Sequence, residues 1–309
     1  MDIKQHIPLA PYTTFHIGGP ADYFITVFST EELVAAVAYA KEKKIPFFVL
    51  GTGANVLVGD KGFRGLVIKN EAHKFQISNF KFPISNDQEK KNISVLLTAE
   101  SGVVIGDLIE ETAKMGLSGL EHFAGIPSTL GGALWQNLHF LSPDRQSTVF
   151  IADIVESANV LLESGEVQQV DRSYFHFEYD YSVLHERKDV VLSASLVLQE
   201  KDPEVIRKTI IANQQWRDAK HPEDAWKKSA GSVFKKIDGY GAGRLIEQAG
   251  LKGKRIGGAE ISMTHANFIL NTGNATAGDV RELISLVQEK VKEQTSLHLE
   301  PEISFVGEF

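Results

Sequence analysis

Two serines and a lysine lie around a glycine in the segment Ser229-Ala-Gly-Ser-Val-Phe-Lys235. A hydroxyl such as that of Ser232 can deliver a proton at a domain interface, and the ammonium of Lys235 can hold a phosphate. The same pattern is also typical of a helix N-cap followed by a surface lysine. The segment lacks the Gly-x-Ser-x-Gly elbow, so the sequence does not support a hydrolase triad.

Glu302 is a candidate acid near the end of the chain. A strand could carry it inward beside the apolar residues Ile303 and Phe305. Burial would raise the pKa of its carboxyl group and let it act as an acid at neutral pH, whereas the alternative is a solvated strand carboxylate. The ten histidines show neither His-x-x-x-His nor His-Glu-x-x-His spacing, so the sequence predicts no metal site.

Two glycine-rich segments could hold an anion. Gly51-Thr-Gly-Ala-Asn55 turns the chain directly after an apolar strand pattern, and Gly125-Ile-Pro-Ser-Thr-Leu-Gly-Gly132 leads into a predicted helix whose free N–H groups favour negative charge. Neither is a Gly-x-Gly-x-x-Gly or Walker sequence. An ordinary tight turn and a helix packed closely on a sheet are the alternatives. Two such segments without a Rossmann fingerprint favour a dinucleotide that is bound in another way.

The elements that must position these residues follow from capping and periodicity. We expect helices at 29–44, 104–115 and 130–137 with Ser128 as N-cap, at 203–219 after Asp202-Pro203, and after Thr276, where the apolar positions are Val280, Leu283, Ile284, Val287 and Val291. Strands are expected at 24–28, 46–50, 55–58, 65–68, 93–97, 151–162, 165–170, 190–198 and, in an edge position because of Pro301, at 299–306. The polar stretch 75–92 fits a loop or a surface hairpin.

Composition sets the class of protein. With 309 residues, 43% of them apolar and 23% charged, the chain should fold into about two domains. Its net charge of -8 offers no basic field for nucleic acid, and its lack of cysteine excludes disulfides, thiolate metal sites and cysteine nucleophiles. No stretch is long and apolar enough for a membrane span, and residues 1–12 lack a leader pattern, so we expect a soluble cytoplasmic protein.

The ordered set of motifs resembles the UDP-N-acetylenolpyruvoylglucosamine reductase (MurB) family. The matching segments are Thr13-Thr-Phe-His-Ile-Gly-Gly-Pro-Ala21, Leu50-Gly-Thr-Gly-Ala-Asn-Val-Leu-Val58, Gly62-Phe-Arg-Gly65, Gly119-Leu-Glu121, Ala124-Gly-Ile-Pro127 with Gly131-Gly132, Ser229-Ala-Gly-Ser-Val-Phe234, Ala249-Gly-Leu-Lys-Gly253, Ile256-Gly-Gly258, Asn271-Thr-Gly-Asn-Ala-Thr276 and Glu300-Pro-Glu302. They recur in order over nearly the whole chain.

The resemblance implies an α+β fold. A two-part FAD-binding domain of the vanillyl-alcohol-oxidase (PCMH) type would cover 1–202, with subdomains 1–69 and 70–202. An α+β substrate-binding domain would cover 203–298, and the tail 299–309 would return to the FAD side. Non-covalent FAD would contact Leu50, Gly51, Thr52, Gly53, Ala54, Asn55, Val58, Gly125, Ile126, Pro127, Ser128, Gly131 and Gly132.

The resemblance also implies a reaction in peptidoglycan precursor synthesis. NADPH would reduce FAD, and the flavin would pass hydride from N5 to C3 of the enolpyruvyl group of UDP-N-acetylglucosamine enolpyruvate. The family's proton-donating serine corresponds to Ser232, which would protonate C2, and its catalytic glutamate to Glu302. The substrate would contact Tyr179, Ser182, Lys235 and His265.

The chain departs from the family pattern in two places. Where the family has Tyr-Arg-x-Ser, with the arginine on the substrate carboxylate, this chain has Tyr179-Asp-Tyr-Ser182. Asp180 would repel that carboxylate, so Arg187 or Arg244 takes the role, Asp180 turns away, or the chemistry is altered. Gln136-Asn-Leu-His139 replaces the usual Asn-Ala-Gly.

The sequence also bears on the class of enzyme. The long tyrosine-bearing substrate loop of one MurB class cannot be found, which indicates the shorter-loop class. A flavin oxidase of the same fold and a non-catalytic flavin-binding module are the alternative functions. The lack of cysteine and the presence of Asn55 in place of a histidine argue against the covalent flavin link of many such oxidases. Ser232 and Glu302, both present in their motifs, weigh against the non-catalytic module.

Overall fold

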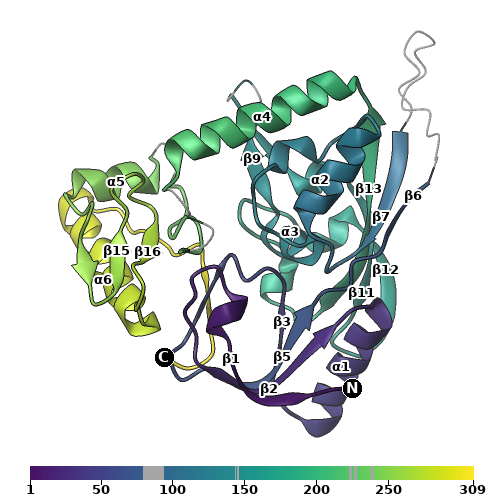
Figure 1. Cartoon of the computed structure of the whole chain (residues 1–309), viewed down its shortest axis with the longest axis horizontal. Helices are drawn as coiled ribbons and strands as arrows, with labels where there is room; N and C mark the ends of the chain where they lie inside the picture. The colour runs from purple at the N-terminus through teal and green to yellow at the C-terminus, as the bar shows by residue number, and fades with distance from the viewer. Residues whose placement is uncertain (79–93, 143, 145, 223–224, 226–227, 238–239) are drawn as a thin grey trace. The chain divides into compact units, whose positions relative to one another are not determined.

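Figure 1 shows the computed structural model, which describes residues 1–78, 94–142, 144, 146–222, 225, 228–237 and 240–309. The contacts divide the chain into two units. Unit 1 comprises Met1–Ile25, Lys44–Val67 and Asp218–Phe309, and unit 2 comprises Thr26–Lys43 and Ile68–Arg217. The division predicted from the sequence, with boundaries after 202 and 298, separates regions by what they bind and not by their contacts, and it stays a prediction.

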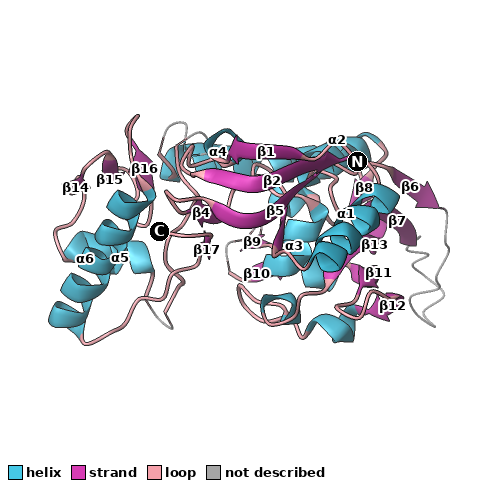
Figure 2. Ribbon diagram, turned by 90° about the horizontal axis from the view of Figure 1, so that it is seen from below, coloured by secondary structure: helices cyan, strands magenta, loops and turns pink. Residues whose placement is uncertain are grey.

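Unit 1 contains most of a four-stranded sheet in the order β1 (Lys4–Pro8), β2 (Pro20–Val27), β5 (Phe63–Asn70), β3 (Phe47–Leu50). Strands β1, β2 and β5 of this sheet lie side by side in the upper middle of Figure 2. An apolar cluster that includes Leu9, Phe24, Leu50 and Val306 packs on it. Strand β17 (Ser304–Val306) pairs in parallel with β4 (Val56–Val58), so the end of the chain lies beside the strand that follows the first glycine-rich turn.

The rest of unit 1 has its own apolar core. A three-stranded sheet, β14 (Arg255–Ile256), β15 (Ala259–Ile261) and β16 (Ile269–Asn271), contacts α6 (Ala277–Thr295), which lies next to α5 (Ala242–Gln248). The α6 residues expected to be apolar and inward-facing are buried, and Thr276 and Asp279 form a capping box at its start. This helix confirms the sequence prediction.

Unit 2 is built on a larger sheet with the order β12 (Val167–Asp171), β11 (Val155–Leu161), β13 (Val190–Glu200), β7 (Ser94–Glu100), β6 (Phe75–Ser78), and β8 (Leu117–Ser118) also pairs with β13. Its helices are α1 (Thr30–Lys43), α2 (Ile105–Lys114), α3 (Leu130–Gln136) and α4 (Pro203–Lys220), whose last three residues fall in unit 1. A hairpin of β9 (His139–Leu141) and β10 (Thr148–Phe150) follows α3.

Alternation along the central strands explains the core of unit 2. Leu97 on β7 and Leu196 on β13 are register partners, and both are fully buried. The helix α3 contacts both strands and brings Leu130 and Leu134 into the same apolar cluster. This packing fixes the start of α3, which carries the second glycine-rich segment.

Two local predictions differ from the structure. The N-cap of α3 is Thr129, whose hydroxyl oxygen accepts from Gly132 N at 3.3 Å; Ser128 instead donates to the Thr129 carbonyl. The strand expected at 151–162 begins with a 3-10 turn over 151–153, because Asp153 accepts the Phe150 N–H and closes a turn. The stretch 75–92, expected to be a loop or a surface hairpin, begins with strand β6, which pairs antiparallel with the next strand β7, as in a hairpin; its remainder lies outside the described residues.

Candidate functional site

Ser232 and Glu302 lie on neighbouring backbone stretches of unit 1. Glu302 N donates to the Val233 carbonyl at 2.8 Å, and Lys235 N donates to the Glu300 carbonyl at 2.9 Å. Ser232 and Glu302 are both half-buried. The two candidate catalytic residues, far apart in the sequence, therefore come within one residue of each other in the pairing register.

A second stretch holds the serine segment from its other side. Ser232 forms an antiparallel bridge with Phe268, and Val233 N donates to the Asn267 carbonyl at 2.8 Å. The Asn267 side chain accepts from Phe234 N at 3.0 Å and donates to the Phe234 carbonyl at 2.9 Å. Because Val233 and Phe234 are also buried, the backbone that carries Ser232 is fixed on both sides. Asn267 was not predicted, since no sequence motif marks it.

The Ser232 hydroxyl makes no hydrogen bond within the part of the chain that the structure describes. Ser229, three residues earlier, is different: its buried hydroxyl donates to the Ala225 carbonyl at 2.8 Å and accepts from Gly231 N at 3.2 Å. Ser229 therefore stabilises the segment. Ser232 keeps a hydroxyl that is available to a ligand.

The turn at 51–55 adjoins Glu302. Asn55 Nδ2 donates to the Glu302 carbonyl at 3.4 Å, and Ser304 N donates to the Asn55 carbonyl at 3.0 Å. Gly53 has a φ of +69°, and a Cβ atom there would lie 2.2 Å from the Tyr12 carbonyl oxygen, so this position requires glycine. Among the described residues, the amide groups of Gly53, Ala54 and Asn55 make no hydrogen bond.

Three consecutive amides without a protein acceptor are what an anion-binding turn would offer. The same close packing of Gly53 on Tyr12 also fits the simpler alternative of a tight turn. Leu50 ends β3, and Val58 ends β4, so the remaining residues predicted for this part of the cofactor site flank the turn.

The loop 125–132 belongs to unit 2. Its helix α3 does not start with free amides as expected, because Leu130 N donates to the Val103 carbonyl at 2.8 Å, Gly131 N to the Ser101 carbonyl at 2.7 Å, and Gly132 N to Thr129. In the described chain, the amides of Gly125, Ser128 and Thr129 are the ones here that make no hydrogen bond. The donors therefore lie before the helix.

A buried arginine supports this loop and was not predicted. Arg217 of α4 is 7% exposed, its side chain lies over the Phe140 ring, and its Cδ and Nε atoms would be 3.3 Å from a Cβ atom on Gly125. One turn earlier, Asn213 Nδ2 donates to the His122 carbonyl at 3.1 Å. The signal in the sequence was that both residues fall on the helical stripe begun by Ile206.

The predicted substrate residues of unit 2 lie in one segment. Ser182 is fully buried, and its hydroxyl donates to the Trp135 carbonyl at 2.8 Å, so this hydroxyl fixes the segment against the end of α3. Tyr179 is 43% exposed. Asp180, between them, is buried and has His139 beside it, with 3.5 Å between Oδ1 and Nδ1.

The two arginines considered for the role of the missing family arginine are both exposed. Arg187 is exposed and lies over the Tyr174 ring, 5.1 Å from its centroid, and Arg244 is exposed on α5. His139 is a basic group in contact with Asp180. The departure from the family pattern at 136–139 is visible in the sequence, whereas the contact of His139 with Asp180 is visible only in the structure.

Lys235 and His265 lie in unit 1. Lys235 Nζ is 3.9 Å from Glu300, and His265 is packed against the rings of His221 and Phe268. Burial lowers the pKa of His265 below its ordinary value, so the imidazole is neutral at pH 7. His265 can then donate or accept a hydrogen bond but carries little charge.

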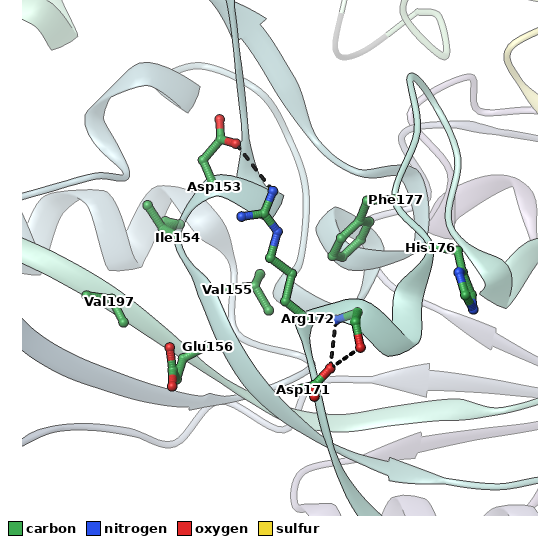
Figure 3. A pocket seen from close by; sticks show the side chains of 10 residues that line it. Asp153, Ile154, Val155, Glu156, Asp171, Arg172, His176, Phe177 and Val197 are labelled. Atoms are coloured by element: carbon green, nitrogen blue, oxygen red, sulfur yellow. Dashed lines mark hydrogen bonds and ion pairs between the residues drawn. The ribbon is translucent and has the colours of Figure 1, made fainter.

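A pocket of about 640 Å³ on unit 2 contains none of the predicted residues. Figure 3 shows that Arg172 pairs with Asp153 at 3.8 Å and that Asp171 accepts from the amide of Ser173 at 2.8 Å. Within the described ranges, no three His, Asp or Glu residues are placed to hold a metal, and no helix is both long and apolar enough to span a membrane.

Comparisons with known proteins cover almost the whole chain. Residues 21–171 match the family model of an FAD binding domain, and residues 221–306 match that of the UDP-N-acetylenolpyruvoylglucosamine reductase C-terminal domain. The reductase of this name from Caldanaerobacter subterraneus subsp. tengcongensis is 40% identical over 97% of this chain and 92% of the relative. The one from Listeria innocua is 36% identical over 99% and 95%.

A solved structure of a reductase of the same name is also similar to this chain. The crystal structure of the reductase (MurB) from Thermus caldophilus matches with a TM-score of 0.78 and 34% identity over 99% of both chains. These matches confirm the predicted α+β fold with an FAD-binding domain and a C-terminal domain of the reductase family. The chain belongs to the UDP-N-acetylenolpyruvoylglucosamine reductase (MurB) family.

Proposed function

We propose that this protein is a flavoenzyme of peptidoglycan precursor synthesis that uses NADPH and FAD to reduce UDP-N-acetylglucosamine enolpyruvate to UDP-N-acetylmuramate. The relatives that match over nearly the full chain carry the name of this reductase. The observation that carries the proposal is in unit 1: the Ser232 segment is hydrogen-bonded to the Glu302 segment, and Glu302 adjoins the turn with three available amides.

Each glycine-rich segment, considered by itself, offers backbone amides that suit a phosphate group of FAD. The amides of Gly53, Ala54 and Asn55 in unit 1, and those of Gly125 and Ser128 in unit 2, can each donate to phosphate oxygens. Backbone donors hold an anion without adding net charge, which agrees with the acidic composition of the chain. When bound, FAD would supply to the substrate the hydride that it has taken from NADPH.

The protein must stabilise the charge that this reduction creates. Addition of hydride to C3 of the enolpyruvyl group places negative charge on C2 and on the adjoining carboxylate, and a proton must then reach C2. Ser232 has the available hydroxyl and donates that proton. Glu302, on the paired stretch, assists its delivery or hydrogen-bonds the developing enolate.

The remaining predicted residues would hold the nucleotide-sugar. Lys235 offers a cation to a phosphate, and neutral His265 offers a hydrogen bond. Tyr179 presents an exposed ring, whereas Ser182 orders the segment through its bond to Trp135. These four contacts, and the cytoplasmic location, are predictions.

The proposal is tested by anaerobic half-reactions on the purified yellow protein. NADPH should bleach the flavin, and the enolpyruvyl nucleotide should then restore the oxidised spectrum without oxygen. Reoxidation by oxygen alone would indicate an oxidase of the same fold, and a flavin that NADPH cannot reduce would indicate a non-catalytic binding module. Either result would refute the proposal.

A further inference from the structure

Asp180 and His139 form a buried pair in unit 2. The Asp180 side chain has no exposed surface, and its Oδ1 lies 3.5 Å from His139 Nδ1. Its backbone is left-handed, with a φ of +53°, a conformation that aspartate and asparagine adopt more readily than most residues. A buried carboxylate is costly without such a neighbour, so the pair requires explanation.

The surrounding backbone is built to hold the pair. Asn137, the left-handed C-cap of α3, donates from Nδ2 to the Glu178 carbonyl at 2.8 Å, and its Oδ1 accepts from Ala152 N at 3.4 Å. Ser182 anchors the other side of Asp180 on Trp135. The turn that carries Asp180 is thus bound to the residues that immediately precede His139.

The two ring nitrogens of His139 differ in burial. Its ring centroid is 4.5 Å from that of Tyr179 and 5.5 Å from that of Phe150, and its side chain is 20% exposed. Nδ1 is buried toward Asp180, whereas Nε2 is neither buried nor hydrogen-bonded among the described residues. Nearby, both polar atoms of the Gln136 side chain are buried and lack a hydrogen-bond partner in the described chain.

These unused polar groups lie at the end of α3 that is away from the loop 125–132. At about 1.5 Å per residue, a helix of this length separates the two ends by about 10 Å. A phosphate at the loop therefore does not occupy the position in front of His139. The exposed Tyr179 ring beside it is itself one of the proposed substrate contacts.

We propose that His139 binds an anionic oxygen of the enolpyruvyl nucleotide through Nε2 and that Asp180 is the positioning residue that holds its Nδ1 side. This inference rests on the proposed function and adds a substrate-binding residue in unit 2. It also gives the aspartate at position 180 a role, since the histidine stands between the buried carboxylate and the incoming anion.

Binding through His139 should take up a proton. Burial lowers the pKa of the free His139 imidazole, and the Asp180 carboxylate and the Asn137 carbonyl partly offset this effect. An anion at Nε2 favours the imidazolium and raises that pKa in the complex. Affinity is then greatest at low pH and falls as the pH rises through the raised pKa.

Other titratable groups face this region from the elements packed around β9. They are Glu121 and His122 of the 3-10 turn 121–123, Asp153 of the turn 151–153, Arg217 of α4 and Tyr179 itself. Burial lowers the pKa of His122 as well. A variant of His139 is therefore needed to assign the titration.

The experiment titrates the oxidised holoenzyme with UDP-N-acetylglucosamine enolpyruvate from about pH 6 to about pH 9 and follows the flavin spectrum. His139→Gln should weaken binding roughly 10- to 100-fold at the acidic end and abolish the pH dependence. Asp180→Asn keeps the left-handed turn and should move the loss of affinity to lower pH. His176→Asn, on an exposed left-handed histidine, is the control and should match the wild type.

Each outcome decides the matter. If His139→Gln keeps the wild-type pH profile, the inference is wrong although the proposed function stands. If Asp180→Asn keeps that profile, the positioning role is wrong. A wild-type protein whose flavin responds to NADPH but which binds no enolpyruvyl nucleotide at any pH refutes the proposed function together with this inference. Flavin content and thermal unfolding of each variant show that the protein is folded.

Discussion

Ser232→Ala isolates one hydroxyl. Among the described residues this hydroxyl makes no hydrogen bond, and the backbone that carries it is held by Asn267 and Glu302 through main-chain and side-chain bonds that alanine leaves intact. We therefore expect the free energy of unfolding to change by less than about 0.5 kcal/mol and FAD to stay bound.

The chemical consequence should be large. A positioned general acid contributes roughly 10²- to 10⁴-fold to a proton-transfer step. At about 1.4 kcal/mol per factor of ten, loss of the Ser232 proton raises the barrier of the second half-reaction by about 3 to 6 kcal/mol. Reduction of the flavin by NADPH needs no proton at C2 and should keep its rate.

Ser229→Ala is the matched control in the same segment. Ser229 is 1% exposed, and its hydroxyl makes two hydrogen bonds. Its removal leaves the half-buried Gly231 N–H without an acceptor among the described residues, and the Ala225 carbonyl keeps only the Lys228 N–H at 3.3 Å. The loss should be about 1 to 3 kcal/mol of stability. Both half-reactions should then be affected alike, through a lower folded fraction.

The assay is anaerobic stopped-flow spectroscopy of each half-reaction, together with thermal unfolding. For Ser232→Ala we expect normal flavin reduction, normal unfolding and strongly slowed reoxidation by the enolpyruvyl nucleotide. An equal loss of both half-reactions, or a melting temperature lowered as in Ser229→Ala, would refute the assignment of Ser232 as proton donor.

Two further variants test the elements that carry the site. Gly53→Ala should reduce FAD retention, and it should destabilise the fold by more than the roughly 1 to 2 kcal/mol of left-handed strain, because the Tyr12 carbonyl blocks a Cβ atom. Gly165→Ala is the control: the space around Gly165 is open, so thermal unfolding should show the strain alone. Equal effects of the two substitutions would contradict the packing argument. Asp279→Ala should cost about 1 kcal/mol at pH 7 in urea unfolding, since its carboxylate accepts from Thr276 N at 3.0 Å and that bond lowers the Asp279 pKa. A lowered pKa stabilises the fold above the unfolded-state value and is lost as the pH falls through the folded value, so the difference should shrink below about pH 4; a constant difference would exclude the charge as its cause.

Local sequence signals placed most of the elements. The Thr276 capping box and the apolar positions after it mark α6 entirely through local signals. Asp202-Pro203 marks the start of α4, where Glu204 N donates to Asp202 Oδ1 at 2.9 Å. The N-cap of α3 was less clear because Ser128 and Thr129 are both good caps, and packing of the next two amides on Val103 and Ser101 selects Thr129.

The functional residues also fall into those that local sequence marks and those that depend on the fold. The candidate proton donor Ser232, the carboxyl group of Glu302 and the glycine-rich turn around Gly53 can be identified from the residue types alone. The pairing of the Ser232 and Glu302 stretches and the contact of His139 with Asp180 are visible only in the folded chain. Pairing between distant stretches depends on long-range packing and chain closure, which no short window of sequence specifies.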